Sequence, residues 1–393
     1  MIEAVAANGY GRTSVKQVVT LAGVSRRAFY EQFSNKQECF LSTLDLIAGR
    51  ALTRIAESYR TSDGTLEERL GAALRSFAEI VREHPKGSRV MLVDAPSAGP
   101  AGWARLTQTL ATFEQRLAAT YAHAPDAAPL PGPVARAIVG GLRRATFVAL
   151  VEGRAEQMPA MADDMLSWAL VFRTSAASPL PDARERVATD VVAGREDEHS
   201  RVLRSALELA ALEGYANLTP MRIADEAGVS IDTFFELYDD MEACVLAAVR
   251  NLGEEVRATV SDPGLTSSEE WPYAVRRALQ QLMRYFAARP ANAQTIATGV
   301  FAMGQRAVNM SAELAGEVAA RLTVGAPGEP QSALAREGIE GAIWHTIYSQ
   351  AARGGTRALP ELSDYLAYVV LAPYLGAEDA ARIVTDSRAT QAA

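Results

Sequence analysis

Apolar residues recur every three or four positions along most of the chain, which is the spacing of one face of an α-helix. One clear example runs from Leu66 through Leu70 to Leu74. Stretches rich in proline and glycine, such as APSAGPAG and APDAAPLPGP, separate these segments as breakers between helices do. Alternation of apolar and polar residues, which half-buried strands require, is absent from the sequence. The pattern predicts an all-α protein.

The helical pattern repeats along the chain at a fixed offset of 205 residues. Residues 3–41 align with residues 208–246 without a gap, and twelve of the 39 pairs are identical. The same offset pairs Pro85 with Pro290, and slightly smaller offsets pair Gly141 with Gly341 and Asp163 with Asp364. Because self-similarity at a fixed period indicates a structural repeat, we expect two complete units in tandem.

Near the start of the first unit, the sequence predicts two short helices joined by a turn, which is a helix-turn-helix. Ser14 and Ser25 stand where the two helices begin, and a serine hydroxyl there can accept a hydrogen bond from a free main-chain N–H. Gly23 supplies the backbone freedom that the sharp turn needs. The spacing places three apolar residues toward the core: Val24, Phe29 and Phe33.

The other face of the second short helix is basic. Arg26 and Arg27 lie on the same side as Tyr30, because residues three and four apart are neighbours on a helix. Guanidinium groups suit guanine edges and phosphates, and Lys36 follows where it can contact the DNA backbone. A glycine turn between amphipathic helices also occurs in folds that bind no DNA, so the turn by itself does not establish DNA binding.

Residues 9–41, GYGRTSVKQVVTLAGVSRRAFYEQFSNKQECFL, resemble the TetR family of bacterial regulators, whose motif runs roughly T-V-x-x-I-A-x-x-A-G-V-S-x-x-x-x-Y-x-x-F-x-x-K. The resemblance implies a DNA-binding domain followed by a helical domain that binds a small effector and dimerises. It also implies that Tyr30 and Lys36 contact phosphates, and that Arg26 and Arg27 lie where bases are read. The expected DNA-binding residues are Ser14, Lys16, Ser25, Arg26, Arg27, Tyr30 and Lys36.

The second copy, GYANLTPMRIADEAGVSIDTFFELYDDMEACVL, keeps the helix signals but loses the basic surface. Ile231, Asp232, Phe235 and Met241 stand in place of the two arginines, the tyrosine and the lysine. Residues 14–38 carry a charge of +2, whereas residues 219–243 carry −6. Since neutralising phosphates supplies most non-specific affinity, we interpret this copy as a structural helix-turn-helix that has lost its hold on DNA. Weak candidates for DNA contact remain at Thr219, Arg222, Ser230 and Thr233.

Two further features concern the ends of the copies. Residues 175–200 are rich in prolines, small residues and mixed charges, which predicts a linker with a short helix at Ala183–Val192. The second copy's opening helix begins near His199, so by the repeat roughly six residues of the matching helix would precede Met1. We therefore expect that the first copy's opening helix either starts upstream or frays.

The expected domains are residues 1–45 (first helix-turn-helix), 46–175 (first effector and dimerisation domain), 176–196 (linker), 197–250 (second helix-turn-helix) and 251–393 (second effector and dimerisation domain).

By the same resemblance, the last two helices of each unit form a four-helix bundle with a partner. These are residues 134–154 and 159–174 in the first unit, and 332–353 and 360–375 in the second. Because one chain carries both pairs, they can form an internal pseudo-dimer; a homodimer of chains is the alternative. The candidate effector pockets contain aromatic and methionine residues, for which plain core is the favoured interpretation: Phe77, Met91, Trp103, Phe113, Phe286, Phe301, Met303 and Trp344.

Composition excludes several other classes of protein. Two cysteines without a CxxC spacing, and four scattered histidines, predict neither a disulfide framework nor a metal site. No apolar run is long enough to span a bilayer and no leader is recognised, so we expect a cytoplasmic protein without a membrane partner. A net charge of −8 argues only weakly against DNA binding.

The sequence carries no catalytic pair, triad or phosphate loop, which predicts no catalytic residues, no enzyme activity and no cofactor. The leading hypothesis is a transcriptional repressor that binds a double-stranded DNA operator and is released by an unidentified small-molecule effector. The alternative is a ligand-sensing or adaptor protein that keeps the fold and binds DNA weakly or not at all.

Overall fold

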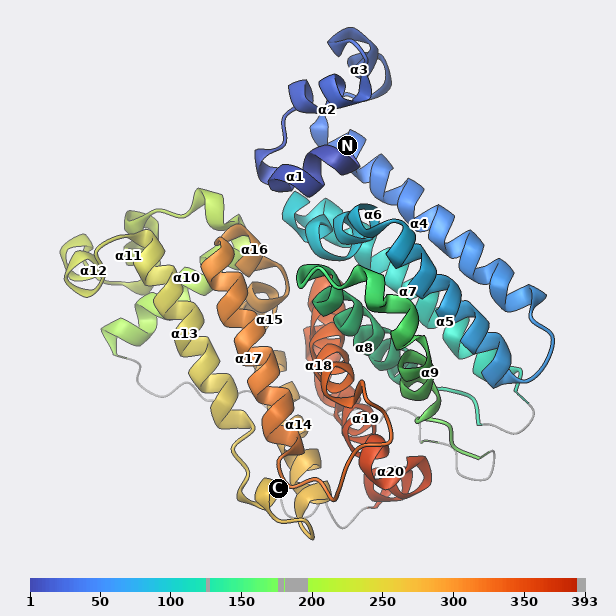
Figure 1. Ribbon diagram of the computed structural model, residues 1–393. Helices are drawn as coiled ribbons and strands as arrows, with labels where there is room; N and C mark the ends of the chain where they lie inside the picture. Colours follow the sequence, from blue (N-terminus) through green and yellow to red (C-terminus); the bar gives the residue numbers. More distant parts are fainter. Residues whose placement is uncertain (125–127, 176–179, 181–196, 387–393) are drawn as a thin grey trace. The chain divides into compact units, whose positions relative to one another are not determined.

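The computed structural model describes residues 1–124, 128–175, 180 and 197–386 (Figure 1). Every regular element within these residues is helical, which confirms the all-α prediction. The chain divides into two compact units, Met1–Ala177 with Gln331–Gly341, and Ser178–Pro330 with Ala342–Ala393. The helix predicted at Ala183–Val192 lies outside the described residues.

The first unit opens with three short helices and continues with longer ones. In chain order these are α1 (Ile2–Arg12), α2 (Val15–Ala22), α3 (Arg26–Gln32), α4 (Lys36–Thr61), α5 (Leu66–Glu83), α6 (Pro85–Arg89), η1 (Val90–Asp94), η2 (Ala95–Ala98), α7 (Pro100–Ala122), α8 (Gly132–Val151), η3 (Ala155–Met161) and α9 (Ala162–Leu170). The antiparallel pair α4 and α5 lies side by side in Figure 1, with the short helices at the start of α4.

The second copy repeats this order with three additional short elements, η4, η5 and α20, and with the short helix α16 in the place of η2. Its elements are α10 (Glu198–Glu213), η4 (Tyr215–Asn217), α11 (Pro220–Ala227), α12 (Ile231–Leu237), α13 (Met241–Thr259), η5 (Pro263–Thr266), α14 (Trp271–Ala288), α15 (Pro290–Gln294), η6 (Thr295–Gly299), α16 (Val300–Ala302), α17 (Gln305–Thr323), α18 (Ala335–Ala352), η7 (Thr356–Leu362), α19 (Ser363–Leu375) and α20 (Ala377–Thr385). The division between the two compact units falls within α18.

The helix boundaries confirm the duplication. Both ends of α2, α3 and α5 map onto those of α11, α12 and α14 with the offset of 205 residues. The π-helical turns η1 and η6 also correspond at this offset, each after a short helix that begins with proline. Backbone conformation repeats as well, since Gly23 has φ of 66° and Gly228 has φ of 64°. The two copies of one sequence pattern therefore share their principal helices.

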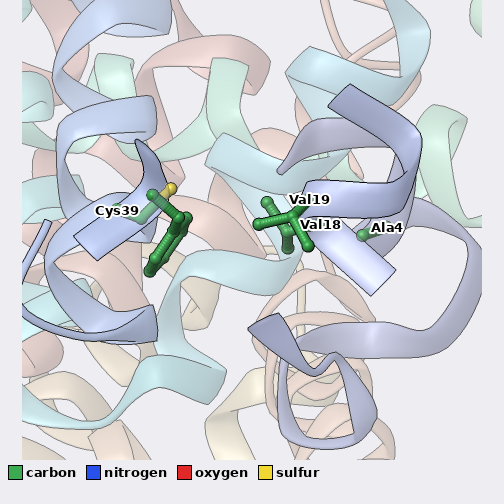
Figure 2. Close-up of a cluster of buried hydrophobic side chains, with 5 residues drawn as sticks. Ala4, Val18, Val19 and Cys39 are labelled. Atoms are coloured by element: carbon green, nitrogen blue, oxygen red, sulfur yellow. The ribbon is translucent and has the colours of Figure 1, made fainter. Parts of the chain in front are cut away.

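The three short helices of the first unit share a small apolar core. Ala4 of α1 packs with Val18 and Val19 of α2, with Phe29 of α3 and with Cys39 of α4 (Figure 2). All five side chains are buried. Packing of this kind stabilises short helices that would be marginal alone, so this cluster holds α3 against the helices around it.

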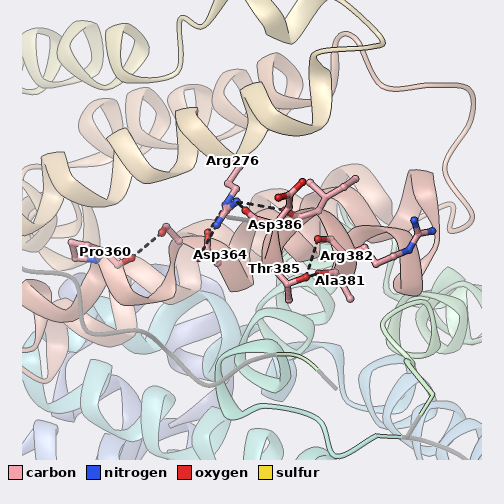
Figure 3. Close-up of polar contacts among 9 residues, drawn as sticks. Arg276, Pro360, Asp364, Ala381, Arg382, Thr385 and Asp386 are labelled. Carbon is pink, nitrogen blue, oxygen red and sulfur yellow. Dashed lines mark hydrogen bonds and ion pairs between the residues drawn. The ribbon is translucent and has the colours of Figure 1, made fainter. Parts of the chain in front are cut away.

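The second unit contains a buried ion pair that the sequence pattern did not predict. Arg276 of α14 is 1% exposed, and its Nε donates to Oδ1 of Asp364 at 2.8 Å (Figure 3). Its Nη1 also donates to the carbonyl oxygen of Asp386 at 2.8 Å, just after α20. One guanidinium thus ties together α14, α19 and the end of α20. The repeat places Gly71 and the exposed Asp163 at the matching positions of the first unit.

Candidate functional site

Hydrogen bonds at the helix starts hold the first helix-turn-helix. Ser14 and Gln17 form a reciprocal capping pair, in which Gln17 Oε1 accepts from the Ser14 main-chain N–H at 2.8 Å. Ser25 Oγ accepts from the Ala28 N–H at 3.0 Å. Both predicted caps are confirmed, because a capping bond depends only on residues two or three positions apart.

One prediction about this motif is wrong. Helical spacing places Val24 toward the core, but its side chain is 47% exposed. It lies in the turn between Gly23 and Ser25, before α3 begins at Arg26, so helical spacing does not apply to it. Phe29 and Phe33 do pack inward, with Phe29 buried and Phe33 partly buried against the same cluster.

The exposed side of α3 carries the residues expected to read DNA. Arg26 is exposed, and Tyr30 is 49% exposed. Arg27 Nε lies 2.9 Å from Glu31 Oε1, and its side chain is 90% exposed. Ion pairs this exposed contribute little energy, so the guanidinium can exchange Glu31 for a phosphate or a base at small cost. Three side chains of one short helix therefore present donors to solvent.

Two lysines flank this helix in different environments. Lys16 on α2 is exposed. Lys36, at the start of α4, is only partly exposed because its ammonium reaches back to α1. Its Nζ donates to the Tyr10 carbonyl oxygen at 2.9 Å and lies 4.2 Å from the centre of the Tyr10 ring. The structure thus places Lys36 as an anchor for the end of α1, a contact that sequence spacing did not indicate.

The second helix-turn-helix is built in the same way but presents a different surface. Thr219 and Ser230 cap α11 and α12, and Ser230 Oγ lies 2.8 Å from Thr233 Oγ1. The guanidinium of Arg222 lies 2.8 Å from Glu213 and 3.5 Å from Glu226. The weak DNA-contact candidates are therefore engaged in caps or paired with carboxylates.

A cavity of about 610 Å³ lies inside the first unit, between α4, α5, α7 and α8. Phe77, Met91 and Phe113, three of the predicted pocket residues, line it. Trp103 is 4% exposed at the start of α7 and is not one of the residues that line the cavity. The volume of the cavity is in the range of cavities that hold small organic ligands.

The cavity wall contains polar residues that the sequence interpretation missed. They are basic: Arg69, Arg116, His123 and Arg143. Basic residues beside amphipathic helical segments usually lie on solvated faces, so the sequence does not distinguish these residues from surface ones. Arg144, next to Arg143, forms an ion pair with Glu340 at 2.7 Å within the first compact unit.

The predicted pocket residues of the second unit lie in aromatic packing. Phe286 is fully buried, and its ring is 6.0 Å from that of Trp344 in an edge-to-face arrangement. Trp344 also contacts Tyr348, with ring centres 6.2 Å apart. Met303 is buried and Phe301 is partly buried. These positions fit the interpretation of such residues as core.

The two thiols, Cys39 and Cys244, are buried at equivalent places on α4 and α13. Burial raises the pKa of both, that of Cys244 to about 12. A thiol with a raised pKa forms little of the reactive thiolate at neutral pH. Within the described residues no cluster of potential metal ligands occurs, and none of the helices there is long and apolar enough to cross a membrane.

Comparison with known proteins finds a family model that matches both helix-turn-helix segments. The model for bacterial regulatory proteins of the tetR family matches twice, at residues 2–43 and 202–248. A curated relative, the HTH-type transcriptional activator FasR of Mycolicibacterium smegmatis, is 26% identical over 83 residues, which is 21% of this chain. The chain covers 37% of that relative's length.

Among solved structures, the fatty acid degradation regulator FadR from Bacillus halodurans matches 46% of this chain and 97% of its own. Its sequence is 15% identical and the TM-score is 0.36, which is too low for the likeness to support a conclusion about this chain.

Proposed function

We propose that the chain is a transcriptional regulator of the TetR family, with two family-like N-terminal units in tandem, and that it holds operator DNA through its first unit. One observation carries the proposal. The exposed face of α3 presents Arg26, Arg27 and Tyr30, while its buried face packs into a core that fixes the helix. Guanidinium groups on the exposed face of a packed helix suit a major groove.

Charge explains why the first unit is proposed as the DNA-binding one. The first motif has a charge of +2 and the second has −6. The only basic residue of the second motif, Arg222, is paired with two carboxylates. Approach of the second motif to phosphates would therefore meet repulsion that salt only partly screens.

Direct titration of labelled duplex DNA from upstream of the gene, at 50 and 200 mM salt, tests both statements. We expect salt-sensitive binding that Asp232→Ala and Phe235→Ala in α12 leave within twofold of the wild type. The triple variant Ile231→Arg, Asp232→Arg, Met241→Lys should raise affinity for random-sequence DNA, because it replaces repulsion by phosphate contacts. Tenfold weaker operator binding in either single variant, with the fold intact, would show that the second unit binds DNA.

We further propose that the bundle helices of the two copies pair within one chain. Residues 331–341, which belong to the second copy in sequence, group with the first compact unit. In that unit, a Cβ on Gly141 would lie 2.6 Å from the Trp168 indole nitrogen, and one on Gly338 equally close to the same ring. Small residues that seat one buried tryptophan support a specific contact.

The molecular mass of the protein in solution, measured at low protein concentration, tests whether the two copies pair within one chain. We expect a stable species of 42.1 kDa, because the pairing surfaces would already be occupied within the chain. A tight dimer of chains that persists on dilution would contradict internal pairing. A weak dimer that forms only on operator DNA would agree with it, since each chain would contribute one DNA-binding motif.

For regulation, we propose repression that a small effector releases by binding in the cavity of the first unit. The support is the cavity's size and its place between α4, which starts at the DNA-binding motif, and α5, α7 and α8. A ligand can release DNA only to the extent that it binds the DNA-free state more tightly.

A second candidate function is an adaptor that senses a ligand and contacts DNA weakly. The observation that favours it is the second motif, where Met221 and Phe235 are 53% and 52% exposed amid acidic residues. Absence of measurable binding to the upstream duplex at 50 mM salt would favour this adaptor over the regulator.

A further inference from the structure

The cavity in the first unit is lined by basic residues and by no acidic residue of the described chain. Four of its lining residues are basic: Arg69, Arg116, His123 and Arg143. None of the described residues that line it is acidic. The rest of the wall is apolar, apart from the hydroxyls of one tyrosine, one serine and two threonines.

Two of the arginines retain unneutralised charge. Arg69 Nε donates to the Tyr59 carbonyl oxygen at 3.4 Å, and its guanidinium lies 4.4 Å from the Tyr59 ring. Arg116 Nη1 donates to the Leu52 carbonyl oxygen at 2.9 Å. Neither forms an ion pair with a carboxylate in the part of the chain that the structure describes. A carbonyl oxygen bears only partial charge, so a carboxylate would bind more strongly to either guanidinium.

The cavity wall is apolar at its buried end and basic at its exposed end. Leu74, Val81 and Met91 are buried deep among the lining residues. Arg69 is partly exposed and Arg116 is exposed, so the cationic groups lie where the cavity meets solvent. A ligand suited to both regions has an apolar body and a charged end.

We propose that this cavity binds organic anions with a long apolar body, whose charged group is held by Arg69 and Arg116. The inference rests on the proposed function, because it names the chemical class of the effector. A cationic ligand would meet like charges at the cavity mouth. A neutral ligand would fill the apolar region but would leave the guanidinium groups without an anionic partner.

The experiment titrates the full chain with three matched series of straight-chain probes: carboxylates, primary alcohols and primary amines of eight to sixteen carbons. Affinity in the first two series should rise about fourfold per methylene until the cavity is full. At equal length, the carboxylate should bind at least about tenfold more tightly than the alcohol, because charge-assisted bonds exceed neutral ones. The amine should bind most weakly.

Variants then assign the charge preference to residues. Arg69→Gln and Arg116→Gln should each reduce the carboxylate-to-alcohol ratio severalfold, and the double variant should bring it close to one. Alcohol affinity should persist in these variants, which shows that the cavity is still folded. Arg105→Gln is the matched control, because Arg105 lies on α7 with Arg116 but pairs with Asp45 and does not line the cavity.

The outcomes separate this inference from the proposed function. Equal affinity for carboxylates and alcohols, or an unchanged ratio in the double variant, overturns the inference and leaves an apolar effector cavity. Failure of every probe to bind overturns both the inference and the effector part of the proposal. Operator binding without ligand is measured separately and bears only on the DNA-binding part.

Discussion

Replacing Arg26 and Arg27 together by alanine should lower the affinity of the chain for its operator by about thirtyfold or more. Each guanidinium that pairs with a base edge or phosphate is worth about 1–3 kcal/mol, and about 1.4 kcal/mol corresponds to a factor of ten. The two contacts together therefore account for about 2–6 kcal/mol. The effect would be larger if two chains each contributed one DNA-binding motif to the same operator.

The fold should tolerate this double change. Both side chains are exposed, and Arg27 pairs with Glu31, whose side chain is exposed as well. The melting temperature should therefore stay near that of the wild type. Arg60→Ala is the control, because Arg60 is 73% exposed and lies near the far end of α4 from the DNA-binding motif. If the double variant bound the operator as tightly as Arg60→Ala does, the assignment of α3 as the DNA-binding helix would be wrong.

Removing the carboxylate of Asp364 should destabilise the second unit by about 3–5 kcal/mol. Arg276 would then be a buried guanidinium without its anionic partner, and breaking a buried pair from one side costs about that much. The carbonyl oxygen of Asp386 would remain as an acceptor, but it cannot compensate a full charge. Chemical denaturation of Asp364→Ala, monitored for the transition of the second unit, measures the loss.

The duplication supplies the control for this prediction. Asp163→Ala changes the equivalent aspartate of the first unit, which is exposed and has Gly71 where the second unit has Arg276. We expect its effect to stay within about 0.5 kcal/mol, as for most surface substitutions. Replacing both members of the pair, as Arg276→Met with Asp364→Leu, should recover most of the lost stability. Equal effects of Asp364→Ala and Asp163→Ala would show that the buried pair contributes nothing.

The sequence alone determined the features that depend on neighbours along the chain. The caps at Ser14 and Ser25, the turn at Gly23 and the matching helix boundaries of the two copies all follow from residue type at short spacing. The contrast between the two motifs was likewise readable, because +2 and −6 are sums over local sequence. Local hydrogen bonds and helical periodicity decide such features before any tertiary contact forms.

Tertiary structure alone decided which side chains pack in the core, which line a cavity and which bond to distant residues. Periodicity placed Phe77 and Trp103 equally well in a core, yet Phe77 lines a cavity and Trp103 does not. A helical face specifies a direction, whereas the residues that meet it from another helix decide whether space remains. Lys36 bonds to a carbonyl 26 residues away, and Arg276 pairs with a carboxylate 88 residues away. Such separations leave no local pattern, so these contacts, and with them the charge of the cavity, emerge only when the helices pack.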